Sequence, residues 1–201
     1  MGRDPGSPRL TVGTRLVLAS ASPRRLELLR TVGLDPHVDA PDVDEAVIPG
    51  ESPADYVVRV ARAKCAVVAG RHDAGMVVLA ADTTVALGAE ILGKPADAAE
   101  ATAMLTRLSG RTHQVHTAVA VCSGGFTLTE LVTTDVTFGE LGADEIAWYV
   151  GLGESFDKAG AYGVQSAGGA LVERIDGSPS NVVGLPLRET LALIRRAAPN
   201  P

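Results

Sequence analysis

Apolar runs of strand length interleave with helix signatures along this chain of 201 residues, and that order constrains the fold most. Strands are expected at 15–20, 76–81, 115–122, 127–138 and 171–175, with a hairpin that runs from 82–87 to 91–92. Helices are expected at 23–32, 53–69, 97–108, 144–150 and in a last segment that ends near 196. Glycine turns at 88–90 and 123–125 predict hairpins. Strands and helices that alternate without a strict repeat favour an α/β protein, with a mixed twisted sheet and flanking helices around a cleft.

The length and composition favour one domain over 15–201, preceded by a disordered leader over 1–14. A chain of this size buries roughly 70% of its unfolded surface, so it needs no metal or disulfide to fold. The net charge of −6 and an aromatic content of 3% disfavour stable nucleic-acid binding, which depends on basic and stacking side chains.

The cysteines and the apolar segments bear on the compartment. Cys65 and Cys122 match no metal or redox spacing, so we expect two buried, unpaired cysteines in a reducing compartment. No apolar run of about 18 residues is present, and no signal peptide is recognisable. We therefore expect a cytoplasmic protein with no membrane partner.

The first strand ends in two serines, Ser20 and Ser22, and runs directly into a helix. Ser22 stands at the N-cap, Pro23 fits the first helical position, and Arg24 and Arg25 follow within the first turn. Arginine has the wrong sign for the helix dipole there unless an anion lies nearby. The alternative is two solvated arginines on an ordinary helix. We favour a junction that binds a phosphate-bearing substrate.

Lys64 and Asp82 are the next anomalies. Lys64 falls on the apolar stripe of its helix, four residues after Val60, so it must either reach solvent or meet an anion. Asp82 follows the apolar run 76–81, and we expect it to end a buried strand at a ligand crevice. There it can bind a divalent cation or accept a proton from water. The alternative for Asp82 is a turn cap.

Two loops hold further candidates. Lys94, between glycine and proline, can reach a phosphate or be an ordinary surface lysine. The loop with Asp42, Asp44 and Glu45 can supply an oxygen ligand to a hard cation, or be merely a solvated acidic loop.

Two other signals are rejected. His113 and His116 lie in a predicted strand, where positions three apart face opposite sides, so they share no metal. The glycine-rich segment 151–169 has neither the dinucleotide-binding nor the P-loop spacing.

Taken together, these motifs resemble the Maf family of nucleoside triphosphate pyrophosphatases. The resemblance covers nearly the whole chain after residue 15. The matching blocks are Leu18-Ala19-Ser20-Ala21-Ser22-Pro23-Arg24-Arg25, Val43-Asp44-Glu45, Ala61-Arg62-Ala63-Lys64, Ala81-Asp82-Thr83-Thr84-Val85, Gly93-Lys94-Pro95, Ser109-Gly110-Arg111-Thr112-His113, Asp157-Lys158-Ala159-Gly160-Ala161-Tyr162-Gly163, Glu173-Arg174-Ile175-Asp176-Gly177 and Asn181-Val182-Val183-Gly184-Leu185-Pro186.

The resemblance implies a fold similar to inosine triphosphate pyrophosphatases, with two lobes. It also implies hydrolysis of a nucleoside triphosphate to the monophosphate and pyrophosphate, with Mg²⁺ or Mn²⁺. By this likeness Asp82 accepts the proton of the attacking water, and Glu45 is its partner acid, both near the metal. Lys64, Lys94 and Arg25 are implied to bind phosphate. A homodimer is expected at the family level only.

Three positions bear on which nucleotide base the substrate carries. Arg24, Thr83 and Gln165 match the group of the family that prefers dTTP and UTP, and a glutamine amide can pair with a uracil or thymine edge. Ser166 departs from the glycine that is common there. The alternative function is a nucleotide-binding regulator of cell division and septum formation with little turnover.

Overall fold

The computed structural model describes residues 15–198, so the expected leader over 1–14 lies outside the described residues. The described chain forms a seven-stranded mixed sheet in the order β2-β1-β3-β5-β6-β7, with β4 paired to β3. The strands are β1 (Leu16–Ala19), β2 (His37–Val38), β3 (Val77–Leu87), β4 (Glu90–Leu92), β5 (Thr112–Ser123), β6 (Phe126–Phe138) and β7 (Val172–Asp176). The strands β2, β1 and β3 are parallel, and the remaining pairs are antiparallel.

The helices cover both faces of this sheet. They are α1 (Pro23–Thr31), α2 (Pro53–Ala69), α3 (Ala98–Leu108), α4 (Ala143–Gly151), α5 (Pro179–Val183) and α6 (Leu187–Ala197), with short 3₁₀ turns η1 (Ala159–Ala161) and η2 (Ala167–Leu171). The mixed sheet with flanking helices confirms the predicted fold class. The sequence missed β2 and α5, which are too short to show a periodic pattern.

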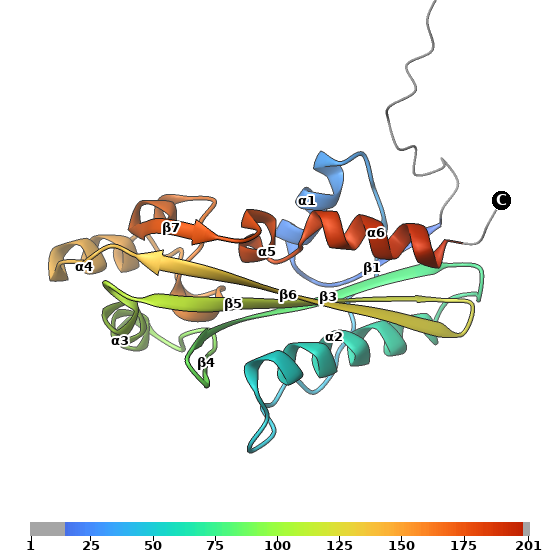
Figure 1. Ribbon diagram of the computed structural model, residues 1–201, viewed down its shortest axis with the longest axis horizontal. Helices are drawn as coiled ribbons and strands as arrows, with labels where there is room; N and C mark the ends of the chain where they lie inside the picture. The colour runs from blue at the N-terminus through green and yellow to red at the C-terminus, as the bar shows by residue number, and fades with distance from the viewer. Residues whose placement is uncertain (1–14, 199–201) are drawn as a thin grey trace, which may run out of the picture.

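Strand alternation divides the core into layers. Figure 1 shows α2 on one side of the long strands, and α1 and α6 on the other. Val17, Val78 and Ala80 face α2, whereas Leu16 and Leu79 face α1 and α6. A third apolar cluster joins α3 and α4 to the far ends of β5 and β6. Successive residues of one strand can therefore reach opposite layers.

The central strand β3 continues past its parallel neighbour, and this corrects one expectation. Asp82 does not end the strand but lies in its interior, between Val77 and Leu87. The pairing of β1 stops at Ala19 opposite Ala80, and β4 joins the same edge only from Val85. The carboxylate therefore lies just beyond the carboxyl end of β1, where the sheet edge is open. An apolar run could not reveal which neighbour ended first.

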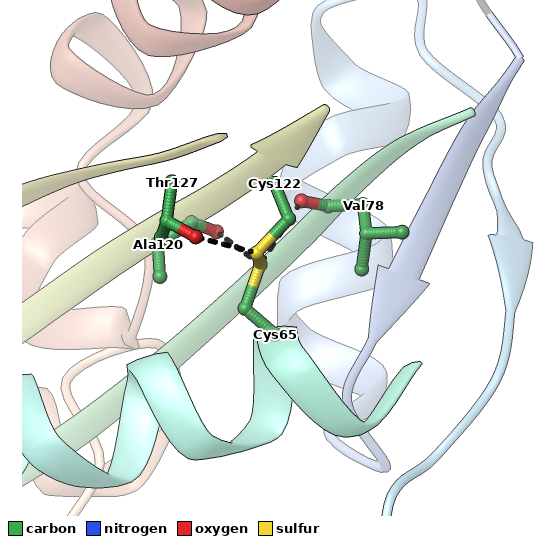
Figure 2. The surroundings of a disulfide bond; sticks show 5 residues. All are labelled: Cys65, Val78, Ala120, Cys122 and Thr127. Atoms are coloured by element: carbon green, nitrogen blue, oxygen red, sulfur yellow. Dashed lines mark hydrogen bonds between the residues drawn. A yellow bond between two sulfur atoms is a disulfide. The ribbon is translucent and has the colours of Figure 1, made fainter. Parts of the chain in front are cut away.

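The cysteines give a second correction. The structure pairs Cys65 of α2 with Cys122 of β5 in a disulfide, and their Cα atoms are 6.2 Å apart. Figure 2 shows the pair between α2 and the sheet, where Cys65 Sγ lies 3.4 Å from the Val78 carbonyl oxygen. Both residues are buried, as expected. Their separation of 57 residues concealed the pairing, because only the packing of α2 on the sheet brings them together.

Candidate active site

A cavity of about 710 Å³ opens at the exposed edge of β3. Its walls come from five segments that are distant in the sequence. These are the β1–α1 junction, α2 with the loop before it, β3 with its neighbour β5 and the turn after β4, the η1 region, and the end of α5. The residues predicted for the site that line it are Ser20, Ser22, Arg24, Arg25, Glu45, Lys64, Asp82, Thr83 and Lys94. The structure thus brings nine of the ten candidates together.

Lys64 connects the two candidate acids. Its Nζ donates to Asp82 Oδ1 at 2.7 Å and lies 2.8 Å from Glu45 Oε1. The Lys64 and Asp82 side chains are buried, whereas about half of Glu45 is exposed. The lysine on the apolar stripe therefore meets anions, which decides between the two alternatives that the sequence left open.

Burial shifts the pKa of Asp82 upward. Removal of the carboxylate from water raises its pKa above the ordinary value, while the charges of Lys64 and Arg25 oppose this shift. The neighbouring charge of Glu45 raises the pKa further. A carboxylate with a raised pKa is a stronger base than a solvated one, which suits a residue that must accept a proton.

Arg25 holds the opposite side of the cavity. It is buried, and its guanidinium donates to the Gly184 carbonyl at 2.9 Å and to the hydroxyls of Ser20 and Thr83 at 3.1 Å each. These bonds use three of the five N–H groups of an arginine, so two remain for an anion. Asp82 faces α2, and the next residue, Thr83, faces α1. Alternation on β3 therefore places the acid and the arginine in opposite walls of one cavity.

Ser22 corrects a detail of the junction. It occupies the N-cap position of α1, and Pro23 begins the helix, but the Ser22 hydroxyl makes no capping bond. Instead, the Ser22 N–H donates to Ser20 Oγ at 3.1 Å. The first turn of α1 thus lacks a side-chain cap at the cavity wall, and it keeps its affinity for an anion.

The η1 region closes the cavity from the other side. Asp157 Oδ2 lies 2.7 Å from Arg24 Nη1, and Lys158 Nζ lies 2.6 Å from the other Asp157 oxygen. Partial burial alone would raise the pKa of Asp157, but hydrogen bonds from Lys158 and Arg24 lower it to about 2. The pair links α1 to η1. Lys94, from the turn after β4, lines the same space.

Gln165 is the one predicted site residue that does not line the cavity. It lies in an exposed turn between η1 and η2. Its contact with a base stays a prediction.

Two groups that sequence reasoning missed belong to the cavity. The Gly184 carbonyl accepts from Arg25, and Tyr56 of α2 lines the wall. A backbone carbonyl leaves no mark in a sequence. Tyr56 stands directly before Val57 on the helix, so it could have been found as a ring beside the stripe that bears Lys64.

The donor set can be tested against the implied metal. Among residues 15–198, no group of three or more His, Cys, Asp or Glu side chains is arranged to hold an ion. Asp82 and Glu45 form a pair of carboxylates. Mg²⁺ binds through one or two carboxylates when waters and substrate phosphates supply its other oxygens. The residues therefore fit a divalent cation that binds together with a nucleotide.

The two rejected histidines serve other purposes. His113 Nε2 lies 2.7 Å from the Tyr162 hydroxyl, and His116 Nδ1 lies 2.9 Å from Thr133 Oγ1. Burial lowers the pKa of His113 to about 4, so it is neutral at physiological pH. Within the described residues, the two histidines thus bond to different partners.

This combination of a mixed sheet and a cavity lined by lysines, arginines and paired carboxylates defines a class of protein that can bind polyphosphate. The sequence model described as Maf-like protein matches residues 15–197, and the chain belongs to the Maf family.

Relatives agree with that assignment. A dTTP/UTP pyrophosphatase of Myxococcus xanthus is 59% identical, over 92% of this chain and 93% of its own length. Proteins with the same name from Anaeromyxobacter dehalogenans (strain 2CP-1) and Symbiobacterium thermophilum are 57% and 50% identical, over 91% and 90% of this chain and 94% and 92% of their own lengths. Among solved structures, a nucleoside-triphosphatase / dITP/XTP pyrophosphatase of Mycobacterium abscessus is 20% identical. The structural match covers 64% of this chain and 76% of that chain, with a TM-score of 0.44.

Proposed function

We propose that this chain is a nucleoside triphosphate pyrophosphatase that hydrolyses dTTP and UTP to the monophosphate and pyrophosphate. The observation that carries the proposal is the Glu45–Lys64–Asp82 cluster, which faces Arg25 and Lys94 across one cavity. The relatives named above bear the same activity in their names, over nine-tenths of the chain.

The reaction follows from the two walls of the cavity. Arg25, Lys64 and Lys94 bind the triphosphate and counter its charge, and the uncapped first turn of α1 adds backbone donors. Asp82 accepts a proton from water as the water oxygen bonds to the α-phosphorus and the bond to the bridging oxygen breaks. Pyrophosphate leaves, and the monophosphate remains. Positioning and charge stabilisation supply most of the acceleration in phosphoryl transfer.

We propose that Asp82 and Glu45 hold Mg²⁺ or Mn²⁺ when the nucleotide binds. Such a cation would neutralise charge that develops on the phosphate oxygens. Lys64 contacts both carboxylates, so its charge offsets their mutual repulsion before substrate arrives.

For the base, we propose that Thr83 and Arg24 help to select pyrimidines together with Gln165. Thr83 and Arg24 line the cavity, and the exposed turn that bears Gln165 would have to move for its amide to reach a base. Ser166 follows in the same turn, and its hydroxyl contacts the Glu154 carboxylate.

The alternative, a regulator of cell division that binds nucleotides with little turnover, is not favoured, because a mere binder has no need of a buried carboxylate where phosphates bind. Release of pyrophosphate from a panel of normal and modified triphosphates, with and without Mg²⁺, tests the proposal. We expect Mg²⁺-dependent release that is fastest with dTTP and UTP. Stoichiometric nucleotide binding without release would contradict it.

We further propose a cytoplasmic location, because nucleoside triphosphates are found there. The expectation of two unpaired cysteines indicated a reducing compartment, but the structure pairs them in a disulfide. The nature of the substrate is therefore the only support for this proposal. Within the described part of the chain, no helix is long and apolar enough to cross a bilayer. A homodimer remains a family-level expectation.

A further inference from the structure

Glu45 is presented to Lys64 by a segment without regular secondary structure, between β2 and α2. Its side chain is half exposed, and so are its apolar neighbours Val47 and Ile48. Val47 nevertheless lines the cavity with Glu45. Neither burial nor a strand ladder therefore explains why this carboxylate stays over the site.

Arg59 of α2 holds the part of that segment that follows Glu45. Its Nε and Nη2 donate to the two carboxylate oxygens of Glu51 at 2.6 and 2.8 Å, and Nη2 also donates to the Ala46 carbonyl at 2.9 Å. Ala46 directly follows Glu45. The Glu51 oxygen that accepts from Nη2 also accepts from the Ile48 N–H at 3.3 Å. One guanidinium thus ties residues 46–51 into a loop against α2.

The surroundings of Arg59 favour a fixed position. The Glu51 side chain is 9% exposed and the Arg59 side chain 31% exposed, so the two-pronged pair is partly shielded from water and is held more firmly than a fully exposed ion pair. The guanidinium also lies 5.6 Å from the centre of the Tyr56 ring, a cation–π distance. Tyr56 lines the cavity, whereas Arg59, Glu51 and Ala46 do not.

We propose that Arg59 is a positioning residue of this enzyme: it acts through the 46–51 loop to hold Glu45 at Lys64 and Asp82. The inference depends on the proposed pyrophosphatase activity for its kinetic consequences, but the loop geometry on which it stands does not. Because α2 carries both Lys64 and Arg59, one rigid element fixes the lysine and the loop that brings its partner.

The kinetic test is a double-mutant cycle between Arg59→Met and Glu45→Gln, with dTTP as substrate. Loss of a residue that orients a ligand costs roughly 10- to 100-fold, so we expect Arg59→Met to lower kcat by at least about tenfold. In the Glu45→Gln background the same change should alter kcat by less than about twofold, because Arg59 then has nothing to position. If the fold-losses in kcat of the two single variants multiply in the double variant, the proposal is overturned.

A second readout needs no turnover. In Arg59→Met, the amides of residues 46–51 should exchange hydrogen for deuterium several-fold faster, while amides of β3 keep their rates. Arg59→Lys keeps the charge but cannot donate two parallel hydrogen bonds to Glu51. Its residues 46–51 should therefore exchange as fast as those of the Met variant. Unchanged exchange of residues 46–51 would refute the proposal.

Arg107→Met is the matched control. Arg107 forms a similar two-pronged pair with Glu90, outside the cavity lining. The Arg107→Met variant should therefore keep the native kcat and the native exchange rates of residues 46–51. If the native chain releases no pyrophosphate, the proposed function fails, and the exchange measurement still decides the role of Arg59. Glu51→Gln, which weakens the same fork from its other side, repeats the test if Arg59→Met does not fold.

Discussion

At the residue scale, the site depends on charges that burial forces into contact. Asp82 and Lys64 are both nearly inaccessible, and each would be costly to bury alone. Their contact at 2.7 Å offsets that cost. Glu45, which lies in a loop, is the third charged residue of the cluster. Arg25 meets only neutral oxygens of the protein, from Ser20, Thr83 and Gly184. No carboxylate accepts a hydrogen bond from it among the described residues, so its remaining N–H groups are available to a phosphate.

Asp82→Asn should lower kcat by roughly 100-fold or more, the effect expected when a general base is lost. Asparagine keeps the volume, so the cavity should retain its shape. Asp135→Asn is the matched control, since Asp135 is also a strand carboxylate but lies on β6, outside the cavity lining. It should retain native turnover, and near-native turnover of Asp82→Asn would remove Asp82 from the proposed role.

The acid limb of the pH profile reports the same carboxylate. Because burial raises the pKa of Asp82, kcat/KM should fall, as pH is lowered, at a pH above the ordinary aspartate value of about 3.8. The charge of Lys64 lowers that pKa, so Lys64→Met should move the acid limb to higher pH, in addition to reducing turnover. An acid limb that Lys64→Met leaves in place, measured in residual activity across pH, would contradict the assignment of the base.

At the scale of elements, most of the local structure could be predicted and the strand pairing could not. Pro23 and the Ser52–Pro53 pair fix the starts of α1 and α2, and Gly88 marks a hairpin turn, because these signals act within a few residues. The interior position of Asp82 depends on where β1 stops opposite β3, which is a contact between distant segments. The same limit concealed the Cys65–Cys122 pair and the Arg59 fork.

The approach of η1 to β3 gives a test at this scale. Gly160 has φ +69°, and an added Cβ would lie 2.9 Å from Val85 Cγ1. Its N–H donates to the Gly93 carbonyl at 3.0 Å, beside Lys94. Gly160→Ala should therefore lower the free energy of unfolding by roughly 1–3 kcal/mol, the usual range for overpacking, and displace the Lys94 turn.

Urea unfolding and turnover measure this change. Val85→Ala in the same chain removes the clashing methyl groups, so the double variant should lose less stability than the sum of the two single losses. Strictly additive losses would show that η1 does not pack on Val85 as described.

At the scale of the whole molecule, the chain folds five remote segments around the open edge of one strand. The sequence identified most of the charged residues because each is anomalous where it stands: an arginine at a helix start, a lysine on an apolar stripe. It could not show which of them touch. Gln165 shows the same limit. The family resemblance predicts that it contacts a nucleotide base, and in the structure it lies in an exposed turn.

In the proposed reaction, this cavity directs water to the α-phosphorus of a nucleoside triphosphate. Hydrolysis of dTTP in water enriched in ¹⁸O, followed by mass spectrometry of both products, tests it most directly. We expect the label to enter dTMP and the pyrophosphate to remain unlabelled. Label in the pyrophosphate, or dTDP and inorganic phosphate as products, would contradict it.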